Sequence, residues 1–199
     1  MNKIKQYENW QEFSPQKTKL PCTWTDKDLE FDWVETIQTD EVPKNDVWES
    51  YTTTQKYFLA ELHKNWGVPD ESTVHYMSFN PQLTEEFASI IEPFKQYNYS
   101  CNLLKLTPGH MLVWHFDTYA TFVKRKDIQQ ESADNIKRSA VMMTDWDCGQ
   151  VLQVGNEVLS HWKKGDVFTW FSYTWHGTCN FGKSDMILAQ VSYLCEDKI

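Results

Sequence analysis

YSCNLLKLTPGHMLVWHFD, residues 99–117, contains two apolar-rich runs joined by the turn Thr107-Pro108-Gly109. Each run is short and mixes aliphatic and aromatic residues, which is typical of β-strands, and proline followed by glycine favours a tight turn. The stretch therefore predicts two successive strands, residues 99–106 and 110–116. It also marks the point at which the chain changes from polar segments with helix signals to short apolar segments with strand signals.

Downstream of this stretch, short apolar segments alternate with turn residues such as Asp147-Cys148-Gly149 and Lys163-Lys164-Gly165. Eight short strands with turns at this spacing predict a β-sandwich or a barrel. The six further strands are expected at residues 138–144, 150–154, 157–162, 166–171, 175–181 and 185–194.

Upstream, residues 1–95 are more polar and carry two helix candidates. One spans residues 45–66 and the other residues 84–94, where Pro93 favours the end of the helix. Helices that precede a run of strands predict an α+β fold, with the helices packed outside one sheet. A chain of 199 residues fits a single domain, here with residues 1–95 as a helical support and residues 96–195 as the β core.

The composition narrows the classes of partner. A net charge of −9 and the presence of only two arginines, Arg125 and Arg138, disfavour nucleic acid as a partner, because phosphates call for a basic face. The sequence shows neither an apolar run long enough to span a bilayer nor a secretory signal pattern, so we expect no membrane partner and a cytoplasmic location. The five cysteines lack a C-x-x-C pair, which predicts free thiols.

The residues most informative about chemistry are His115, Asp117 and His176. Residues i and i+2 of a strand share a face, so His115 and Asp117 can point the same way at the end of their strand. His176, at the start of a later strand, can supply a third ligand. Two imidazoles and a carboxylate on one side of a metal leave open coordination positions, an arrangement that suits iron(II). The competing interpretation is two ordinary half-buried histidines and an aspartate that begins a turn.

Two stretches, LTPGHMLVWHFD at 106–117 and HWKKGDVFTWFSYTWHGTCNFG at 161–182, resemble the core of the iron(II)/2-oxoglutarate oxygenases. They are most similar to the aspartyl/asparaginyl β-hydroxylase-like and prolyl-hydroxylase-like branches, and the resemblance covers roughly residues 97–194. It implies a double-stranded β-helix of the cupin or jelly-roll type. It also implies iron(II), 2-oxoglutarate as cosubstrate and oxygen, with ascorbate as an additional reductant.

The reaction implied by this resemblance is hydroxylation of an unactivated C–H bond, with release of succinate and carbon dioxide. The two branches favour an amino acid, free or in a peptide, as the small-molecule or peptide substrate. Relatives carry a basic residue about ten positions after the last histidine, which pairs with the distal carboxylate of 2-oxoglutarate. In this chain that position is Met186. Arg138 is the preferred substitute, because a guanidinium binds a carboxylate through two hydrogen bonds, and Lys183 is the second candidate.

Other residues are candidates for the walls of the pocket. The segment between Asp117 and Arg138, residues 118–137, is expected to form a loop or short helix that acts as a lid. For each polar wall candidate, a solvated strand face or a turn is an equally open interpretation. The candidates are Tyr99 and Asn102 for the cosubstrate, and Trp114, Gln150, Gln153 and Trp175 for the substrate.

Two further functions stay open from the sequence. A non-redox cupin that binds zinc or nickel and a small molecule would use the same two histidines and carboxylate. A non-enzymatic β-sandwich interaction module would bind no metal, and its histidines would be dispensable.

Overall fold

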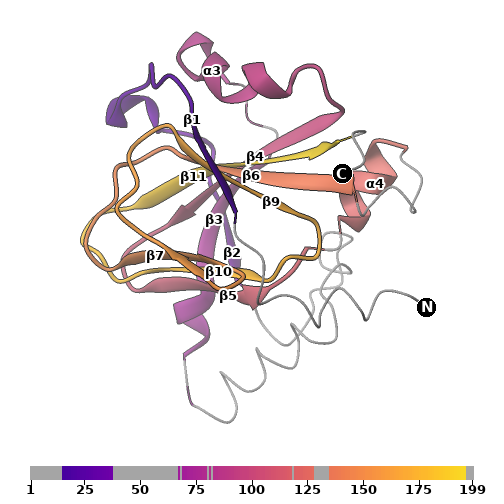
Figure 1. Cartoon of the computed structure of the whole chain (residues 1–199). Helices are drawn as coiled ribbons and strands as arrows, with labels where there is room; N and C mark the ends of the chain where they lie inside the picture. The colour runs from indigo at the N-terminus through magenta and orange to yellow at the C-terminus, as the bar shows by residue number, and fades with distance from the viewer. Residues whose placement is uncertain are drawn as a thin grey trace, which may run out of the picture.

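The computed structural model of the chain describes residues 15–37, 67, 69–79, 81, 83–117, 119–127 and 135–195. Two antiparallel β-sheets pack face to face, and short helices lie outside them (Figure 1). The seven-stranded sheet has the order β1 (Gln16–Lys19), β9 (Asp166–Phe171), β6 (Ile136–Met142), β11 (Met186–Leu194), β4 (Tyr99–Leu106), β3 (Val74–Phe79) and β2 (Val34–Ile37). The four-stranded sheet has the order β5 (His110–His115), β10 (His176–Asn180), β7 (Gln150–Val154) and β8 (Glu157–Leu159).

From β4 onward, the chain passes back and forth between the two sheets. Strands β4, β6, β9 and β11 lie in the larger sheet, and β5, β7, β8 and β10 lie in the smaller one. This strand order is that of a double-stranded β-helix, the jelly-roll topology of cupins, so the predicted fold class is confirmed. The bounds of β4, β7 and β9 are those predicted from the sequence, whereas β8 is three residues shorter than predicted.

The N-terminal part differs from the helical support that was predicted. Strand β1 pairs with β9 at one edge of the larger sheet, while β3 pairs with β4 and β2 with β3 at the other edge. Strands β1 and β2 were missed because edge strands are short and often polar, so their sequence signal is weak. In β1, for example, all four residues are exposed.

The helix predicted at residues 84–94 is present, but as a series of short segments. These are η5 (Glu85–Phe87), α3 (Ala88–Ile91) and η6 (Glu92–Phe94), and Pro93 lies in the last of them. Two more 3-10 helices are η2 (Asp26–Asp28) and η4 (Asp70–Thr73). The helix predicted at residues 45–66 lies outside the described residues.

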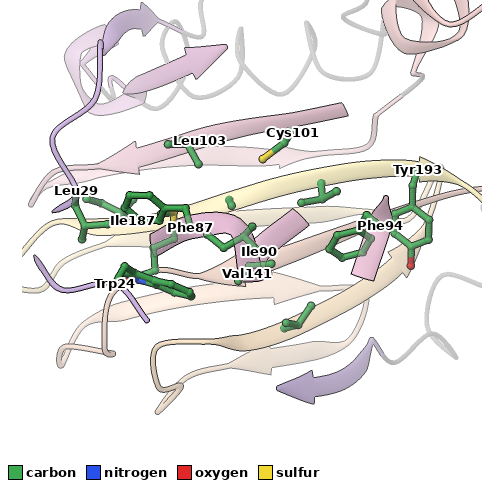
Figure 2. Packing of buried hydrophobic residues seen from close by; sticks show 14 of the residues in the cluster. Trp24, Leu29, Phe87, Ile90, Phe94, Cys101, Leu103, Val141, Ile187 and Tyr193 are labelled. Carbon is green, nitrogen blue, oxygen red and sulfur yellow. Dashed lines mark hydrogen bonds between the residues drawn. The ribbon is translucent and has the colours of Figure 1, made fainter. Parts of the chain in front are cut away.

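Alternation along the strands of the larger sheet builds two core layers. In β4, Cys101 and Leu103 face outward, whereas Leu104 and Leu106 face the smaller sheet. The outer layer is covered by the N-terminal segments, which place Trp24, Phe87 and Ile90 on the sheet (Figure 2). Full burial of such a side chain stabilises a fold by roughly 1.5–3 kcal/mol, so the short helices are held by packing rather than by their length.

The predicted lid is only partly a separate segment. Helix α4 (Ala120–Arg125) lies within it, and the buried side chains of Tyr119, Phe122 and Val123 pack against Ile136. Ile136 and Lys137, however, already belong to β6, so the prediction that the segment extends to residue 137 is wrong. The start of β6 had been missed because Lys137 interrupts its apolar pattern.

The five cysteines are free thiols, as predicted. Cys101 is buried in the outer core layer, and burial raises its pKa to about 12, which makes this thiol unreactive. Among the helices that the structure describes, none is both long enough and apolar enough to cross a lipid bilayer.

Candidate metal centre

A β-bulge turns His115 toward the space between the sheets. His176 of β10 pairs with His115 of β5, but Thr178 pairs with Leu112, so Gly177 faces two residues of β5. The extra residue brings both Leu112 and His115 onto the inner face, whereas strict alternation would place them on opposite faces. A Cβ atom at Gly177 would lie 3.2 Å from the backbone nitrogen of Trp114, which explains why glycine stands opposite the bulge.

Backbone carbonyl groups orient both imidazole rings. Nδ1 of His115 lies 2.6 Å from the carbonyl oxygen of Val113, and Nδ1 of His176 lies 2.9 Å from that of Thr174. A carbonyl oxygen can only accept a hydrogen bond, so Nδ1 of each ring carries the proton and Nε2 keeps its lone pair. The ring centroids are 4.3 Å apart. This is the tautomer and the second hydrogen bond expected of metal-binding histidines.

Asp117 completes the cluster from the segment that follows β5. Its Oδ2 atom lies 3.5 Å from Nε2 of His176, and one potential ligand atom from each of His115, Asp117 and His176 lies within 4.8 Å of the others. His115 and His176 are 5% and 3% exposed, so the cluster is shielded from solvent on the side of the histidines. The three residues predicted as ligands therefore lie together.

The donor set fits a divalent metal ion. Oδ2 of Asp117 and Nε2 of His176 are both buried, and neither forms a hydrogen bond with any described residue. Buried polar atoms rarely lack a hydrogen-bond partner, so two such atoms side by side fit the donor set of a bound cation. Two nitrogen ligands and one carboxylate oxygen suit iron(II) or zinc.

The protonation states agree with that fit. Burial lowers the pKa of His176 to about 3 and also lowers the pKa of His115, so both rings are neutral near pH 7. Burial alone would raise the pKa of Asp117, but the nearby guanidinium of Arg138 and the two histidines lower it below the usual value. Neutral imidazoles and an ionised carboxylate are the forms that bind metals.

Arg138 reaches the same cluster from β6. Its Nη2 atom lies 3.1 Å from Oδ2 of Asp117, and the two side chains are 12% and 25% exposed. The contact is an ion pair by distance, but it lacks the alignment of a hydrogen bond, since neither Nε of Arg138 nor Oδ2 of Asp117 has a bonded partner in the described part of the chain. The predicted anion-binding residue thus contacts a candidate metal ligand directly.

Tyr119 and Trp170 were not predicted from the sequence, yet both border the cluster. Tyr119 has a left-handed backbone (φ 56°), and its ring lies 5.2 Å from the guanidinium carbon of Arg138. Trp170 stands opposite Arg138 in the sheet, and its ring centroid is 5.1 Å from that of His176. Alternation in DVFTWF could have identified Trp170 as inward-facing, whereas the sequence holds no signal for the backbone of Tyr119.

The two residues of β4 that were predicted to hold the cosubstrate face opposite ways. Asn102 shares the inner face with Leu104, so its position agrees with a role in the pocket. Tyr99 shares the outer face with Cys101 and packs against the outer core layer, so its assignment to the cosubstrate is wrong. Tyr99 and Asn102 are three positions apart, so the alternation of side chains along β4 places them on opposite faces. The sequence alone did not show which of these faces was inward.

Three of the substrate-pocket candidates face away from the cluster. Trp114 and Trp175 stack on each other with centroids 6.1 Å apart. Each precedes an inward-facing histidine, so alternation places each on the opposite side of the smaller sheet. Gln153 lies between Leu152 and Val154, which point inward, and it therefore points outward too.

Gln150 and Lys183 lie at the other end of the smaller sheet. Gln150 pairs with Asn180, four residues along β10 from His176, a separation of about 13 Å. Its amide donates to the carbonyl oxygen of Ser184 and accepts from the backbone nitrogen of Asp147, which is a structural role. Lys183 is an exposed residue in the turn beyond Asn180. Neither residue borders the cluster. An extended strand carries the chain from His176 to the opposite end of the sheet, so residues only a few positions after a ligand can lie far from it.

No family model matches the sequence, and a search of curated proteins finds no match. Among solved structures, a predicted oxalate decarboxylase from Thermotoga maritima is 16% identical with a TM-score of 0.39, and the match covers 61% of this chain and 82% of that one. KdgF from Halomonas sp. is 10% identical with a TM-score of 0.38, over 62% and 81% of the two chains. The cupin domain of Cnp3 from Schizosaccharomyces pombe is also 10% identical, with a TM-score of 0.38 over 61% of each chain. Similarity this low supports no inference about activity, so the chemistry has to be derived from the chain's own residues.

Proposed function

We propose that this protein is an iron(II)- and 2-oxoglutarate-dependent oxygenase that hydroxylates an unactivated C–H bond. The observation that carries the proposal is the inward-facing cluster of His115, Asp117 and His176, whose buried nitrogen and oxygen atoms lack an aligned hydrogen bond. These three residues would hold the metal on one side and leave the other side open for a cosubstrate and oxygen. When bound, iron(II) with 2-oxoglutarate supplies the oxidising chemistry, and succinate and carbon dioxide are released.

The chain's own residues would bind, orient and shield the reactants. Arg138 places a guanidinium beside the cluster, where it can donate hydrogen bonds to a carboxylate group of 2-oxoglutarate. Trp170, which is 3% exposed, covers the ring of His176 and excludes water from that side. Asn102, on the inner face of β4, can add a neutral hydrogen-bonding group to the same space. The substrate we propose is an amino acid, either free or as a residue of a peptide.

The first experiment tests the cosubstrate. Protein loaded with iron(II) without oxygen should develop a visible metal-to-ligand absorption band on addition of 2-oxoglutarate. With oxygen and ascorbate, it should then release succinate, faster with the right member of a panel of peptides and free amino acids. If the iron-loaded protein binds no 2-oxoglutarate, the protein is a non-redox metal-binding cupin. If it binds no metal at all, the remaining interpretation is the non-enzymatic interaction module.

A pair of variants tests the carboxylate partner. Arg138→Ala should raise the apparent Michaelis constant for 2-oxoglutarate roughly ten- to a hundredfold, because a charge-assisted contact is worth about 1.5–3 kcal/mol. Lys183→Ala is the control, since this exposed residue lies in the turn beyond Asn180 and should leave that constant unchanged. The opposite result, an effect of Lys183 alone, would contradict the placement of the cosubstrate beside the metal cluster.

A further inference from the structure

We propose that Arg138 competes with the metal ion for Asp117, and that a dicarboxylate ligand relieves this competition, so that the metal and the dicarboxylate bind cooperatively. The inference rests on the proposed function, because it takes His115, Asp117 and His176 as the metal ligands. It goes further by assigning Arg138 a role in coupling the two binding events.

The competition follows from one oxygen atom. Oδ2 of Asp117 is the atom 3.5 Å from Nε2 of His176, and it is also the atom 3.1 Å from Nη2 of Arg138. A cation that binds Oδ2 together with His176 is therefore separated from the guanidinium by a single carboxylate oxygen. Two cations at that separation repel each other, and the repulsion is strong in a site that is largely closed to water.

Donor groups next to Arg138 indicate where an anion would bind. Nε of Arg138 and Nε1 of Trp170 are buried without a hydrogen-bond partner among the residues that the structure describes, and the buried hydroxyl group of Tyr119 lies near Asp117 and Arg138 without an aligned hydrogen bond. They come from β6, from β9 and from the residue that precedes α4. Arg138 and Trp170 are directly paired across the sheet, and the ring of Tyr119 lies 5.2 Å from the guanidinium carbon. A carboxylate placed among them would satisfy three donors that are otherwise costly to bury.

The charge balance favours a ligand with two negative charges. Asp117 and Arg138 carry opposite charges, and imidazole rings that donate through Nδ1 and offer Nε2 to a metal are neutral, so the cluster by itself has no net charge. A divalent metal ion raises the formal charge to plus two, and a dianion returns it to zero. Buried charges are tolerated when they are balanced, which favours a dicarboxylate over a monocarboxylate or a neutral ligand.

Cooperativity is the consequence that can be measured. If the anion moves the charge of Arg138 away from Asp117, the metal binds more tightly when the anion is present. By linkage, the anion then binds more tightly when the metal is present, by the same factor. An arginine that merely positioned Asp117 would have the opposite effect, because its removal would weaken metal binding.

The test is a titration of the full-length protein with cobalt(II), followed by visible absorption, with and without succinate as a non-reacting dicarboxylate. In wild type, succinate should tighten cobalt binding about tenfold, within the range typical of coupled sites, and the uncharged succinamide should not. Arg138→Gln should bind cobalt about tenfold more tightly than wild type without succinate and should lose the succinate effect. Arg125→Gln, which alters the only other arginine of the chain, an exposed one, should behave as wild type.

Each other outcome is decisive. Weaker cobalt binding by Arg138→Gln would overturn the competition and make Arg138 a positioning residue. An equal succinate effect in wild type and Arg138→Gln would place the anion elsewhere. If Arg138→Gln does not fold, Arg138→Lys carries the test, since it keeps the charge but not the fork of donors; it should bind cobalt as wild type does, with a smaller succinate effect. A triad variant that binds cobalt as wild type does would instead refute the metal site itself, so the two failures are distinguishable.

Discussion

Strand β10 connects two polar clusters that differ in how completely their atoms are paired. At its Asn180 end, which we call the paired end, the amide of Asn180 donates to the carbonyl oxygens of Leu106 and Ser184. The amide of Gln150 donates to Ser184 as well, and Oδ2 of Asp147 accepts from the backbone nitrogen and the hydroxyl group of Ser184. Each side chain there joins two or more turns, so this end is built for stability.

At the His176 end, which we call the unpaired end, several buried polar atoms lack an aligned hydrogen bond, although Asp117 and Arg138 form an ion pair. Oδ2 of Asp117 and Nε2 of His176 meet three donors, from Arg138, Trp170 and Tyr119, without an aligned hydrogen bond in the described structure. Because unpaired buried atoms are costly, their concentration at one end of the strand indicates a ligand site. The comparison teaches that the pairing of polar atoms, rather than their polarity alone, distinguishes the candidate ligand site from the structural cluster.

The largest expected effect is on metal binding at the unpaired end. His176→Ala or Asp117→Ala should weaken cobalt(II) binding by more than the roughly 10–100-fold that loss of a ligand's hydrogen-bonding partner typically costs, because a ligand itself is removed. His110→Ala is the matched control on the same sheet, since its ring bonds to Thr107 in the turn before β5. Cobalt affinity that survives His176→Ala would erase the distinction between the two ends.

A substitution at the paired end should lower stability and leave cobalt affinity nearly unchanged. Asn180→Ala removes the amide donor to the carbonyl oxygen of Leu106, one of two amide donors to that of Ser184, and the acceptor of the backbone nitrogen of Gly182, so the free energy of unfolding should fall by about 3 kcal/mol. Cobalt affinity should stay within twofold of wild type, on the order of the scatter expected for independent sites. Urea denaturation measures the first quantity, and Asn98→Ala, at an exposed asparagine, is the control. A large loss of cobalt affinity would mean that the two ends are coupled.

Gly177 sharpens the comparison because it lies beside the unpaired end but contributes no ligand. The Cβ atom of Gly177→Ala would press on the backbone of Trp114 at 3.2 Å and displace the bulge that aims His115. Cobalt affinity should fall about tenfold, equivalent to about 1.4 kcal/mol. Gly109→Ala, at the other end of β5, would have no contact within 4 Å but is strained by its φ of +89°, so it should lower stability without lowering cobalt affinity. Equal effects of both substitutions on cobalt would argue against a role for the bulge.

The smallest effect concerns acid stability at the paired end. Hydrogen bonds from the backbone nitrogen of Lys183, from Ser184 and from Cys148 lower the pKa of Asp147 below its usual value, against an opposing effect of burial. A lowered carboxyl pKa contributes stability above the pKa of the unfolded chain, and this contribution is lost as the pH falls through the folded pKa. Wild type should therefore exceed Asp147→Asn in free energy of unfolding at pH 7, by a margin that shrinks below about pH 4. A margin that does not change with pH would show that the charge of Asp147 is irrelevant.

Most of the core strands could be predicted from the sequence, because strand and turn signals depend on residues that are neighbours in the sequence. Turns such as Thr107-Pro108-Gly109 and alternating runs such as residues 166–171 depend on neighbours in the sequence, and these elements have the bounds that the sequence predicted. The edge strands β1 and β2 were missed, because exposed edge strands need no apolar pattern, and the interior strand β3 was missed as well. Most residues predicted to line the pocket do not border the cluster, because the inward face of a strand cannot be assigned until the strands it pairs with are known.

The sequence by itself determined the positions of the core strands along the chain, the turns between them and the identity of the three candidate ligands. Only the tertiary structure decided that a bulge opposite Gly177 turns His115 inward, that Arg138 contacts Asp117, and that Tyr99 points away. The physical reason is that strand propensity and turn geometry act over a few residues, whereas register and ion pairing join strands that are distant in sequence. Whether a buried polar atom is paired is likewise settled only when those strands meet.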